Sequence, residues 1–479
     1  MARRLAPMLF PTIDFALFFA FSFALVWGLN SYNTLKKVVL LALSLAFYAS
    51  WNWRFLLLLL ASGAISYFVG LYVDAAARRP FRRLALGLGV ALDLGILAYF
   101  KYLDFFIAQV LTLAHALGLN PSIDFVNVTL PVAISFLTFH AISYAVDVYR
   151  GRLAPSRSPL DIVLYISFFP HLVAGPIVRA HEFLPQLASP RRAGDFSFGE
   201  NMLLILGGLF KKMVIANYLA VRFVDPVFTD PSQFSRFDLI VAVYAYAIQI
   251  YADFSAYTDI AIGVAALLGY RFPQNFNQPY RALGIGDFWR RWHMTLSNWL
   301  RDYLYIPLGG NRHGALATAR NLLLTMLLGG LWHGANWTFL IWGAMHGVAL
   351  VVDHAWRRSA AFARFGAGPI ARVVDWAVTF HFVCFAWLFF RAPSLDAATQ
   401  FLAGVWNDNG AANTMPMVVL PLIGCGALTQ IVPWQTRGAI GAVLDDRGPL
   451  LQTAFGFALL YAIVVMAPSA SAPFIYFQF

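Results

Sequence analysis

The chain has 479 residues, of which 60% are hydrophobic and only 12% are charged. An ordinary soluble domain carries about 25% charged residues, so this composition excludes that class. The net charge of +11 does not indicate nucleic-acid binding, because excess Lys and Arg in a membrane protein belongs mainly to cytoplasmic loops. The two cysteines, Cys384 and Cys425, lie in apolar segments and offer neither a disulfide framework nor metal-ligand spacing.

Apolar runs of about 18 or more residues recur along the chain, each long enough to cross a hydrocarbon layer of about 30 Å. We expect an all-α polytopic membrane protein with about 10–12 crossings and no separate soluble domain. The first run is interpreted as a membrane helix, because it contains Pro11 and Asp14 and lacks a clear cleavage site for a signal peptide. The candidate segments are 12–30, 36–52, 55–75, 84–100, 102–118, 130–148, 158–177, 200–222, 237–268, 319–333, 336–355, 373–391, 415–432 and 450–468.

Basic loops before the second segment and after the third fall on one side of the membrane, and the positive-inside rule makes that side cytoplasmic. Strict alternation then places the arginines of 150–157 outside, a conflict that disappears if 102–118 does not span. This indicates re-entrant or interfacial segments. The stretch 168–187 is one candidate, because Pro170 and Pro176 interrupt its apolar run; it could line an entrance or be a plain re-entrant turn.

Polar residues inside apolar segments are candidates for function. In segment 237–268, Asp253 and Tyr257 are four residues apart and therefore share one face of a helix. Such residues could bind a substrate, or they could form a buried hydrogen-bonded network that holds helices together.

The densest patch of charge and indole is Asp287–Arg312, DFWRRWHMTLSNWLRDYLYIPLGGNR. At about 100° per residue, its aromatic side chains fall in one arc and its arginines in the other, which predicts one amphipathic helix in the membrane interface. His293 sits at the edge of the apolar arc, beside Trp289. Its imidazole could reach into a cavity, or it could belong to a membrane-surface anchor.

A second stretch, 320–347, carries His333 about 20 Å of helix beyond Arg320, hence well inside the hydrocarbon layer. A histidine at that depth is costly unless it has a partner or a wet cavity, so a chemical role is favoured over a structural one. Gly329, Gly330 and Gly334 either let helices approach closely or leave room for a substrate.

These histidines suit acid–base chemistry. A neutral imidazole can take a proton from a hydroxyl at physiological pH, and burial favours the neutral form. His333 and His293 could therefore activate a hydroxyl for attack on an acyl thioester. The spacing of the ten histidines shows no zinc pattern, so no metal site is expected.

The stretches DFSAYTDIAIG, RFPQNFNQPY, DFWRRWHMTLSNWLRDYLYIPLGGNR and GGLWHGANWTFLIWGAMHG resemble the membrane-bound O-acyltransferase (MBOAT) family. Specifically, they are similar to its bacterial polysaccharide branch, typified by alginate O-acetyltransferase. The resemblance implies that His333 is the essential catalytic residue and His293 the second functional position. It also implies a ring of tilted, partly re-entrant helices around a central funnel, in a single domain over 1–479 with a motif-bearing core at about 160–355.

The hypothesis that follows is an O-acyltransferase of the bacterial inner membrane. It would move an acetyl group from a cytoplasmic thioester donor, acetyl-CoA, toward a hydroxyl of an exported polysaccharide such as alginate. No cofactor is expected, and the expected partners are the lipid bilayer, the thioester donor and a periplasmic acyltransferase or polysaccharide-export protein, with no nucleic acid. The expected substrate-binding residues are Arg290, Arg291, Trp292, Asn298, Arg301, Asp253, Tyr257 and Trp332.

Three alternatives stay open at this stage. The arginines among these residues could attract the phosphates of coenzyme A, or they could anchor lipid headgroups. Broken helices with buried Asp and His also fit a transporter or flippase of a lipid-linked or anionic substrate. A structural subunit of an export complex, with no chemistry of its own, is the third alternative.

Overall fold

The structure is a computed structural model that describes residues 8–77, 79–173, 175–188, 196–366, 368–408, 410–433, 435–470 and 472–477. The chain divides into two compact units, which are described separately. Unit 1 holds residues 1–196 and 264–272, and unit 2 holds residues 197–263 and 273–479. The single domain that the sequence predicts over the whole chain stays a prediction.

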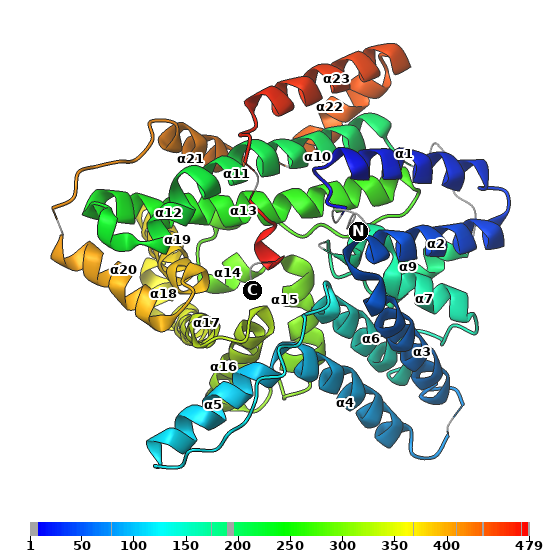
Figure 1. Cartoon of the computed structure of the whole chain (residues 1–479), viewed down its shortest axis with the longest axis horizontal. Helices are drawn as coiled ribbons and strands as arrows, with labels where there is room; N and C mark the ends of the chain where they lie inside the picture. Colours follow the sequence, from blue (N-terminus) through cyan, green and yellow to red (C-terminus); the bar gives the residue numbers. More distant parts are fainter. Residues whose placement is uncertain are drawn as a thin grey trace. The chain divides into compact units, whose positions relative to one another are not determined.

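Unit 1 consists of helices in the part that the structure describes (Figure 1). The stretch 168–187 is broken as predicted: a short helix covers Phe169–Leu172, with Pro170 in its first turn, and another begins only at Ala180. The helices of unit 1 are α1 (Ile13–Gly28), α2 (Asn33–Asn52), α3 (Leu56–Tyr72), α4 (Arg82–Lys101), α5 (Leu103–Ala116), α6 (Ile134–Tyr149), α7 (Pro159–Ser167), α8 (Phe169–Leu172) and α9 (Ala180–Phe183).

Unit 2 is also helical in its described residues, and the long helix α13 forms its backbone. Unit 2 also contains three π-helical stretches outside α13, at Lys211–Ala216, Ala220–Val224 and Arg301–Tyr305. Its helices are α10 (Phe198–Phe210), α11 (Asn217–Leu219), α12 (Asp225–Thr229), α13 (Arg236–Leu267), α14 (Ile285–Trp289), α15 (Met294–Leu300), α16 (Gly314–His333), α17 (Trp337–Arg357), α18 (Ala360–Phe365), α19 (Pro369–Arg391), α20 (Leu395–Asn407), α21 (Val419–Leu428), α22 (Gln435–Asp445) and α23 (Pro449–Met466).

Each apolar segment predicted from the sequence contains a helix in the described part of the chain. Among these residues, eight helical spans are long and apolar enough to cross a membrane, and three shorter apolar helices accompany them. The all-α polytopic class is therefore confirmed.

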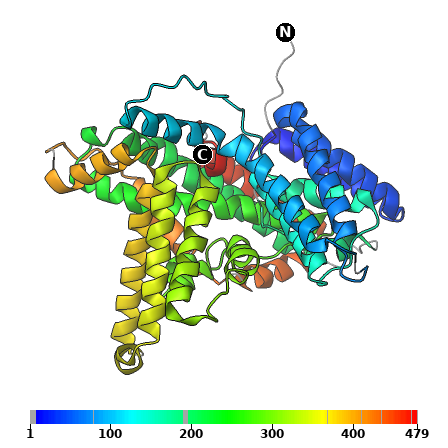
Figure 2. The same cartoon turned by 90° about the horizontal axis from the view of Figure 1, so that it is seen from below.

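Helices α16 and α17 run side by side as the yellow-green and yellow ribbons of Figure 2. Helix α16 ends at His333, directly before the turn into α17. The two helices pack closely because Gly330 has no side chain; a Cβ there would collide with the carbonyl oxygen of Phe339. Gly334 faces the Phe339 ring in the same way. Of the two roles left open for these glycines, the structure therefore favours close approach, because protein atoms occupy the space beside them.

The single amphipathic helix predicted for 287–312 is wrong. The chain leaves helical geometry between α14 and α15, where His293 adopts a left-handed backbone conformation with φ of 40°. The indoles of Trp289, Trp292 and Trp299 are buried in the protein, whereas Arg290 is exposed. The pattern thus correctly predicted that the indoles are buried and that Arg290 is exposed. The indoles are covered by protein rather than by lipid, and the helix is broken at His293.

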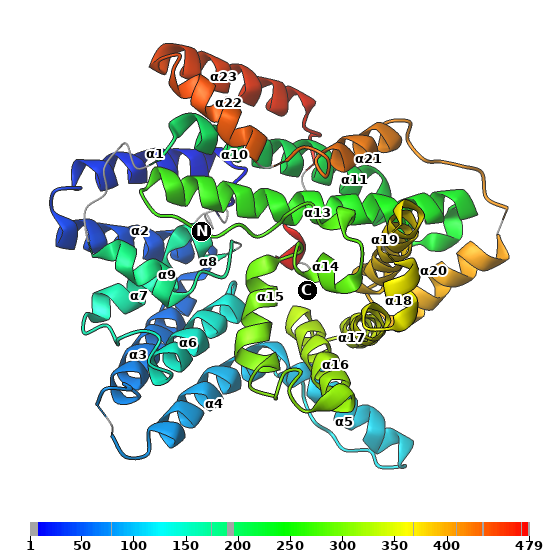
Figure 3. The ribbon, with the colours of Figure 1, turned by 180° about the vertical axis from the view of Figure 1, so that it is seen from behind.

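The C-terminal segment returns from α23 to the middle of unit 2. In Figures 1 and 3 it is the red turn beside α13 and α14. Its residues Phe474 and Ile475 are buried. The backbone N–H of Ile475 donates to Asp253 Oδ2 at 2.9 Å, and the carbonyl of Ala472 accepts from Lys212 Nζ at 3.0 Å. Residues remote in sequence therefore complete the centre of this unit.

Candidate active site

His293 is held by Asn275, which lies on the extended loop between α13 and α14. The Asn275 carbonyl accepts from the backbone N–H of Met294, and Asn275 Oδ1 accepts from the backbone N–H of Thr295 at 3.1 Å. These N–H groups open α15 and would otherwise lack partners. Capping by a residue from another segment explains why the chain starts a new helix here instead of continuing α14.

The same amide oxygen fixes the protonation of His293. A backbone N–H can only donate, so the atom that faces Thr295 is the oxygen, and His293 Nδ1, 3.1 Å from it, must carry a proton and donate. His293 Nε2 then holds a lone pair, and this atom is buried without a hydrogen-bond partner among the described residues. Burial lowers the pKa of His293 to about 3, so the ring is neutral at physiological pH.

His333 is the last residue of α16, directly before the turn into α17. Asn336 caps α17 by accepting from the Thr338 N–H at 3.0 Å, which ends the turn three residues after the histidine. The side chain is almost completely buried, at 5% exposure. Its ring lies edge-on to Trp342, with centroids 5.1 Å apart, and at the same centroid distance from Phe390.

Aromatic rings connect the two histidines. Trp332 lies between them, with its ring centroid 6.4 Å from that of His293 and 4.9 Å from that of His333. Tyr476 of the C-terminal segment lies 5.7 Å from His333 and 4.7 Å from Phe254, the ring that meets His293 edge-on at 4.6 Å. The structure therefore brings His293, His333 and Trp332 into one cluster.

Asp253 and Tyr257, on the same face of α13 as predicted, border this cluster. Asp253 Oδ1 forms an ion pair with Lys212 Nζ at 2.8 Å, and both side chains are almost fully buried. The Tyr257 ring packs on Phe474 with centroids 4.0 Å apart. In this arrangement both residues hold the C-terminal segment in place, which corresponds to the buried network considered from the sequence.

The remaining predicted binding residues lie elsewhere in unit 2. Arg291 pairs with Asp287 at 3.0 Å and Arg301 with Asp302 at 2.7 Å, while Arg290 is largely exposed. Asn298 is exposed on α15. Trp292 packs inside the protein, between Phe276 at 5.0 Å and Trp387 at 4.9 Å.

Sequence reasoning did not single out three residues of this site: Asn275, Lys212 and Tyr476. Asn275 lies within the RFPQNFNQPY stretch, but an asparagine in a loop gives no local sign of what it binds. Lys212 is an ionisable residue inside an apolar segment, which is by itself a signal of function or of a buried partner. Tyr476 follows a loop and belongs to no periodic pattern, so only the fold reveals its position.

Comparison with known proteins assigns the family. The model of the membrane-bound O-acyltransferase family matches residues 152–393. The chain is 38% identical to a probable alginate O-acetylase of Azotobacter vinelandii, over 93% of this chain and 95% of the relative. It is 39% identical to a peptidoglycan O-acetyltransferase of Helicobacter pylori, over 78% and 75%, and 29% identical to a teichoic acid D-alanyltransferase of Bacillus subtilis, over 54% and 68%.

The apolar helices and the buried histidine cluster define a multi-pass membrane protein with a site suited to acid–base chemistry. The chain belongs to the membrane-bound O-acyltransferase family. It is therefore an O-acyltransferase, and the transporter and structural-subunit alternatives are set aside.

Proposed function

We propose that this protein transfers an acetyl group from cytoplasmic acetyl-CoA, through the membrane, to a hydroxyl of an exported polysaccharide such as alginate. The observation that carries the proposal is the convergence of His293 and His333 on one buried aromatic cluster. A histidine can act as a general base, and burial keeps the ring of His293 neutral.

In the proposed step, His333 takes the proton of the acceptor hydroxyl while the hydroxyl oxygen attacks the thioester carbonyl carbon. The carbon–sulfur bond then breaks, and the proton passes from His333 to the departing sulfur, leaving an ester and free coenzyme A. His293 positions the donor. Its Nε2 lone pair is available to accept a hydrogen bond from an amide N–H of the pantetheine arm.

A polar pocket near His293 supports the choice of a phosphate-bearing donor. Arg281, Arg291 and Arg372 line this pocket of about 580 Å³, together with the carboxylate of Asp287. Three guanidinium groups against one carboxylate leave a positive surface that suits phosphate groups. Arg291 lies two residues before His293, so phosphates held here would start the donor close to the site. Arg290, being exposed, would add attraction at the surface.

The names of the relatives support this choice of acceptor. Several similar proteins bear the name alginate O-acetylase, one is a peptidoglycan O-acetyltransferase, and the more distant ones are teichoic acid D-alanyltransferases. Each of these names gives a polymer as the acceptor of an acyl group. We place the protein in the bacterial inner membrane, with a periplasmic acyltransferase or export protein that completes delivery to the polymer.

The test is the acetyl ester content of exported glycans, measured by mass spectrometry in cells that lack the protein. We expect ester to be lost, to return with the wild type, and to stay absent with His333→Ala. His354→Ala is the matched control, because His354 lies near the end of α17 and contacts Arg358 rather than the cluster. Ester formation by His333→Ala, at equal protein level, would contradict the assigned base.

A further inference from the structure

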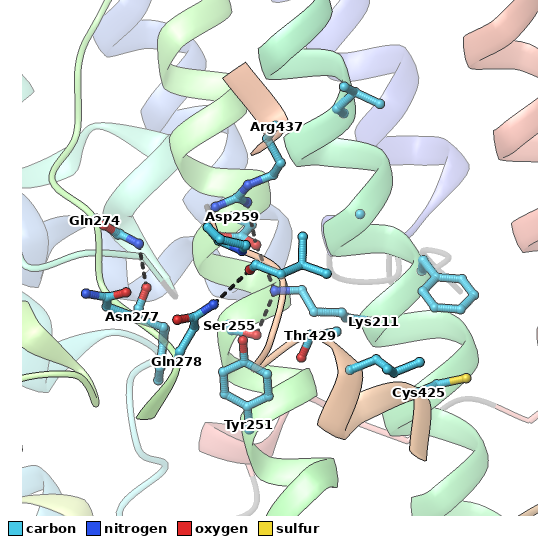
Figure 4. Close-up of a pocket in the computed structure, with 17 residues that line it drawn as sticks. Lys211, Tyr251, Ser255, Asp259, Gln274, Asn277, Gln278, Cys425, Thr429 and Arg437 are labelled. Atoms are coloured by element: carbon cyan, nitrogen blue, oxygen red, sulfur yellow. Dashed lines mark hydrogen bonds and ion pairs between the residues drawn. The ribbon is translucent and has the colours of Figure 1, made fainter. Parts of the chain in front are cut away.

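A second pocket in unit 2 is lined by charged side chains that have no role in the proposed transfer reaction. It measures about 360 Å³ and lies between α10, α13 and the α21–α22 region (Figure 4). Lys211 Nζ donates to Ser255 Oγ and to Asp259 Oδ2, each at 2.7 Å. Arg437 reaches the same carboxylate oxygen at 3.3 Å.

The charges in this pocket do not balance. Two cations share the Asp259 carboxylate, so a net positive charge remains in a place where Lys211 is only 9% exposed. Lys211 and Asp259 both lie on helical spans long and apolar enough to cross a membrane. Unbalanced charge in such surroundings is costly, and an anion in the pocket would compensate it.

The remaining walls are those expected for an amphiphile. Side-chain amides of Gln274, Asn277 and Gln278 form one wall, and apolar side chains of α10 and α21 form another. Leu428 and Val432 line the pocket and are also more than half exposed, so the apolar wall continues onto the outer surface of the protein. A pocket at the lower end of the usual ligand range holds a headgroup, while chains attached to it would follow this outer strip.

We propose that this pocket binds an anionic membrane lipid, whose phosphate headgroup carries a net negative charge. The phosphate lies between Lys211 and Arg437, the amides donate to the headgroup, and the acyl chains run along the exposed apolar residues of α21. A lipid is favoured over a free anion because the pocket joins two candidate membrane-crossing helices to an exposed apolar strip.

Gly207 provides a way to fill the pocket without changing its charge. It lines the cavity, and nothing lies within 4 Å of a Cβ built on it, so the first atom of a larger side chain meets open space there and Gly207→Leu is chosen to fill the pocket. Gly424, on α21 outside the lining, also has open space around its Cβ, and Gly424→Leu is the matched control. Arg437→Gln removes one cation, and Arg447→Gln, just beyond α22 and outside the lining, removes an equal charge elsewhere.

The experiment measures lipid binding to the purified full chain in a neutral detergent by native mass spectrometry, with phosphatidylglycerol and phosphatidylcholine as probes. We expect the wild type to prefer phosphatidylglycerol, and Gly207→Leu and Arg437→Gln to weaken its binding by about tenfold or more, as loss of a charge-assisted contact does. Both control variants should bind like the wild type.

Equal binding of phosphatidylcholine, or equal binding by all variants, would overturn the proposal. Competition experiments distinguish a lipid from the other phosphate-bearing ligands that could occupy the pocket. Displacement of the lipid by inorganic phosphate at equal concentration would assign the pocket to a small anion, and displacement by acetyl-CoA would assign it to the acyl donor; either result overturns the lipid assignment. None of these measurements depends on transfer activity, so they stand apart from the test of the proposed function.

Discussion

Lys212 Nζ lies 2.8 Å from Asp253 Oδ1 in the interior of unit 2, and the two side chains also bind the backbone of the C-terminal segment. A single ion pair thus connects the π-helical turn after α10, the long helix α13 and the residues that carry Tyr476 to the cluster. Because both groups are buried, neither can be removed without leaving the other uncompensated.

We therefore expect Asp253→Asn to lower the free energy of unfolding by about 3–5 kcal/mol, the usual cost of breaking a buried pair. The C-terminal segment should become sensitive to a carboxypeptidase, and acyl transfer should fall with it. Thermal unfolding in detergent and limited proteolysis would measure both effects. Asp408→Asn, at an exposed pair with Arg236, should change neither, and an unaltered Asp253→Asn protein would refute this role of the pair.

The second prediction concerns Asn275 and His293. Asn275→Ala removes the acceptor that orients the imidazole, so we expect the transfer rate to fall by about 10- to 100-fold, in the range found for groups that orient a functional histidine. Asn275→Asp keeps the acceptor but adds a negative charge, which raises the pKa of His293 from about 3. Its rate should therefore decline at acidic pH where that of the wild type does not.

A pH–rate profile between pH 5 and 8 distinguishes these outcomes. Asn407→Ala, at the exposed end of α20, is the control for loss of an amide. Identical profiles for Asn275→Asp and the wild type would show that Asn275 does not control the protonation of His293.

The third prediction is an acid sensitivity of the fold. The pKa of His293 is lowered from 6.5 to about 3 by burial, so between these values the unfolded chain binds a proton that the native protein does not. The stabilisation is complete above pH 6.5 and is lost as the pH falls toward 3. His293→Gln, which cannot be protonated, should show a smaller fall in Tm between pH 7 and pH 5 than the wild type. Equal falls in Tm would contradict the buried, neutral state of His293.

The fourth prediction concerns the turn that presents His333. Gly334 has extended backbone geometry, with φ of −163°, so alanine meets no backbone strain there; the obstacle is the Phe339 ring beside it. Gly334→Ala should lower Tm and transfer activity, and Phe339→Leu in the same chain should restore part of both. Gly424→Ala has open space and should be silent. If the second substitution restores nothing, the ring is not the cause.

The fifth prediction separates His346 from the other buried histidines. His346 Nδ1 accepts from Trp289 Nε1 at 3.3 Å, and its ring packs on Trp342 at 4.8 Å. We expect His346→Gln, which retains an acceptor, to keep most of the transfer rate, whereas His333→Gln abolishes it. Comparable losses in both variants, measured at equal protein level, would mean that His346 takes part in the reaction.

The membrane helices could be predicted from the sequence because a lipid-facing helix needs a long continuous apolar run, and such runs are visible locally. The candidate segment 319–333 ends at His333, as α16 does. The break at His293 could not be predicted, because the cap that causes it comes from Asn275, 18 residues earlier in the chain. Helical periodicity favoured a continuous helix, and a tertiary contact decided otherwise.

The sequence predicted the two histidines and Trp332 of the candidate site, but not the residues that hold them in place. Asp253 was visible as a buried carboxylate, yet its partners lie on another helix and in a segment 222 residues away. Contacts of that length leave no periodic trace in a sequence. The arginines of 290–301 gave the reverse result: their pattern was clear, but most of them pair with nearby carboxylates rather than point into the cluster.

The path of the C-terminal segment has a practical consequence for anyone who purifies or labels this enzyme. Tyr476 lies with its ring centroid 5.7 Å from that of His333, so any polypeptide joined shortly after it begins beside this histidine. An affinity tag or a fluorescent protein fused there would compete with the native packing of Phe474 and Ile475. Loss of activity in such a fusion protein would then be caused by the tag and not by the enzyme itself. A tag inserted in an exposed loop, such as the one after α20, avoids this effect.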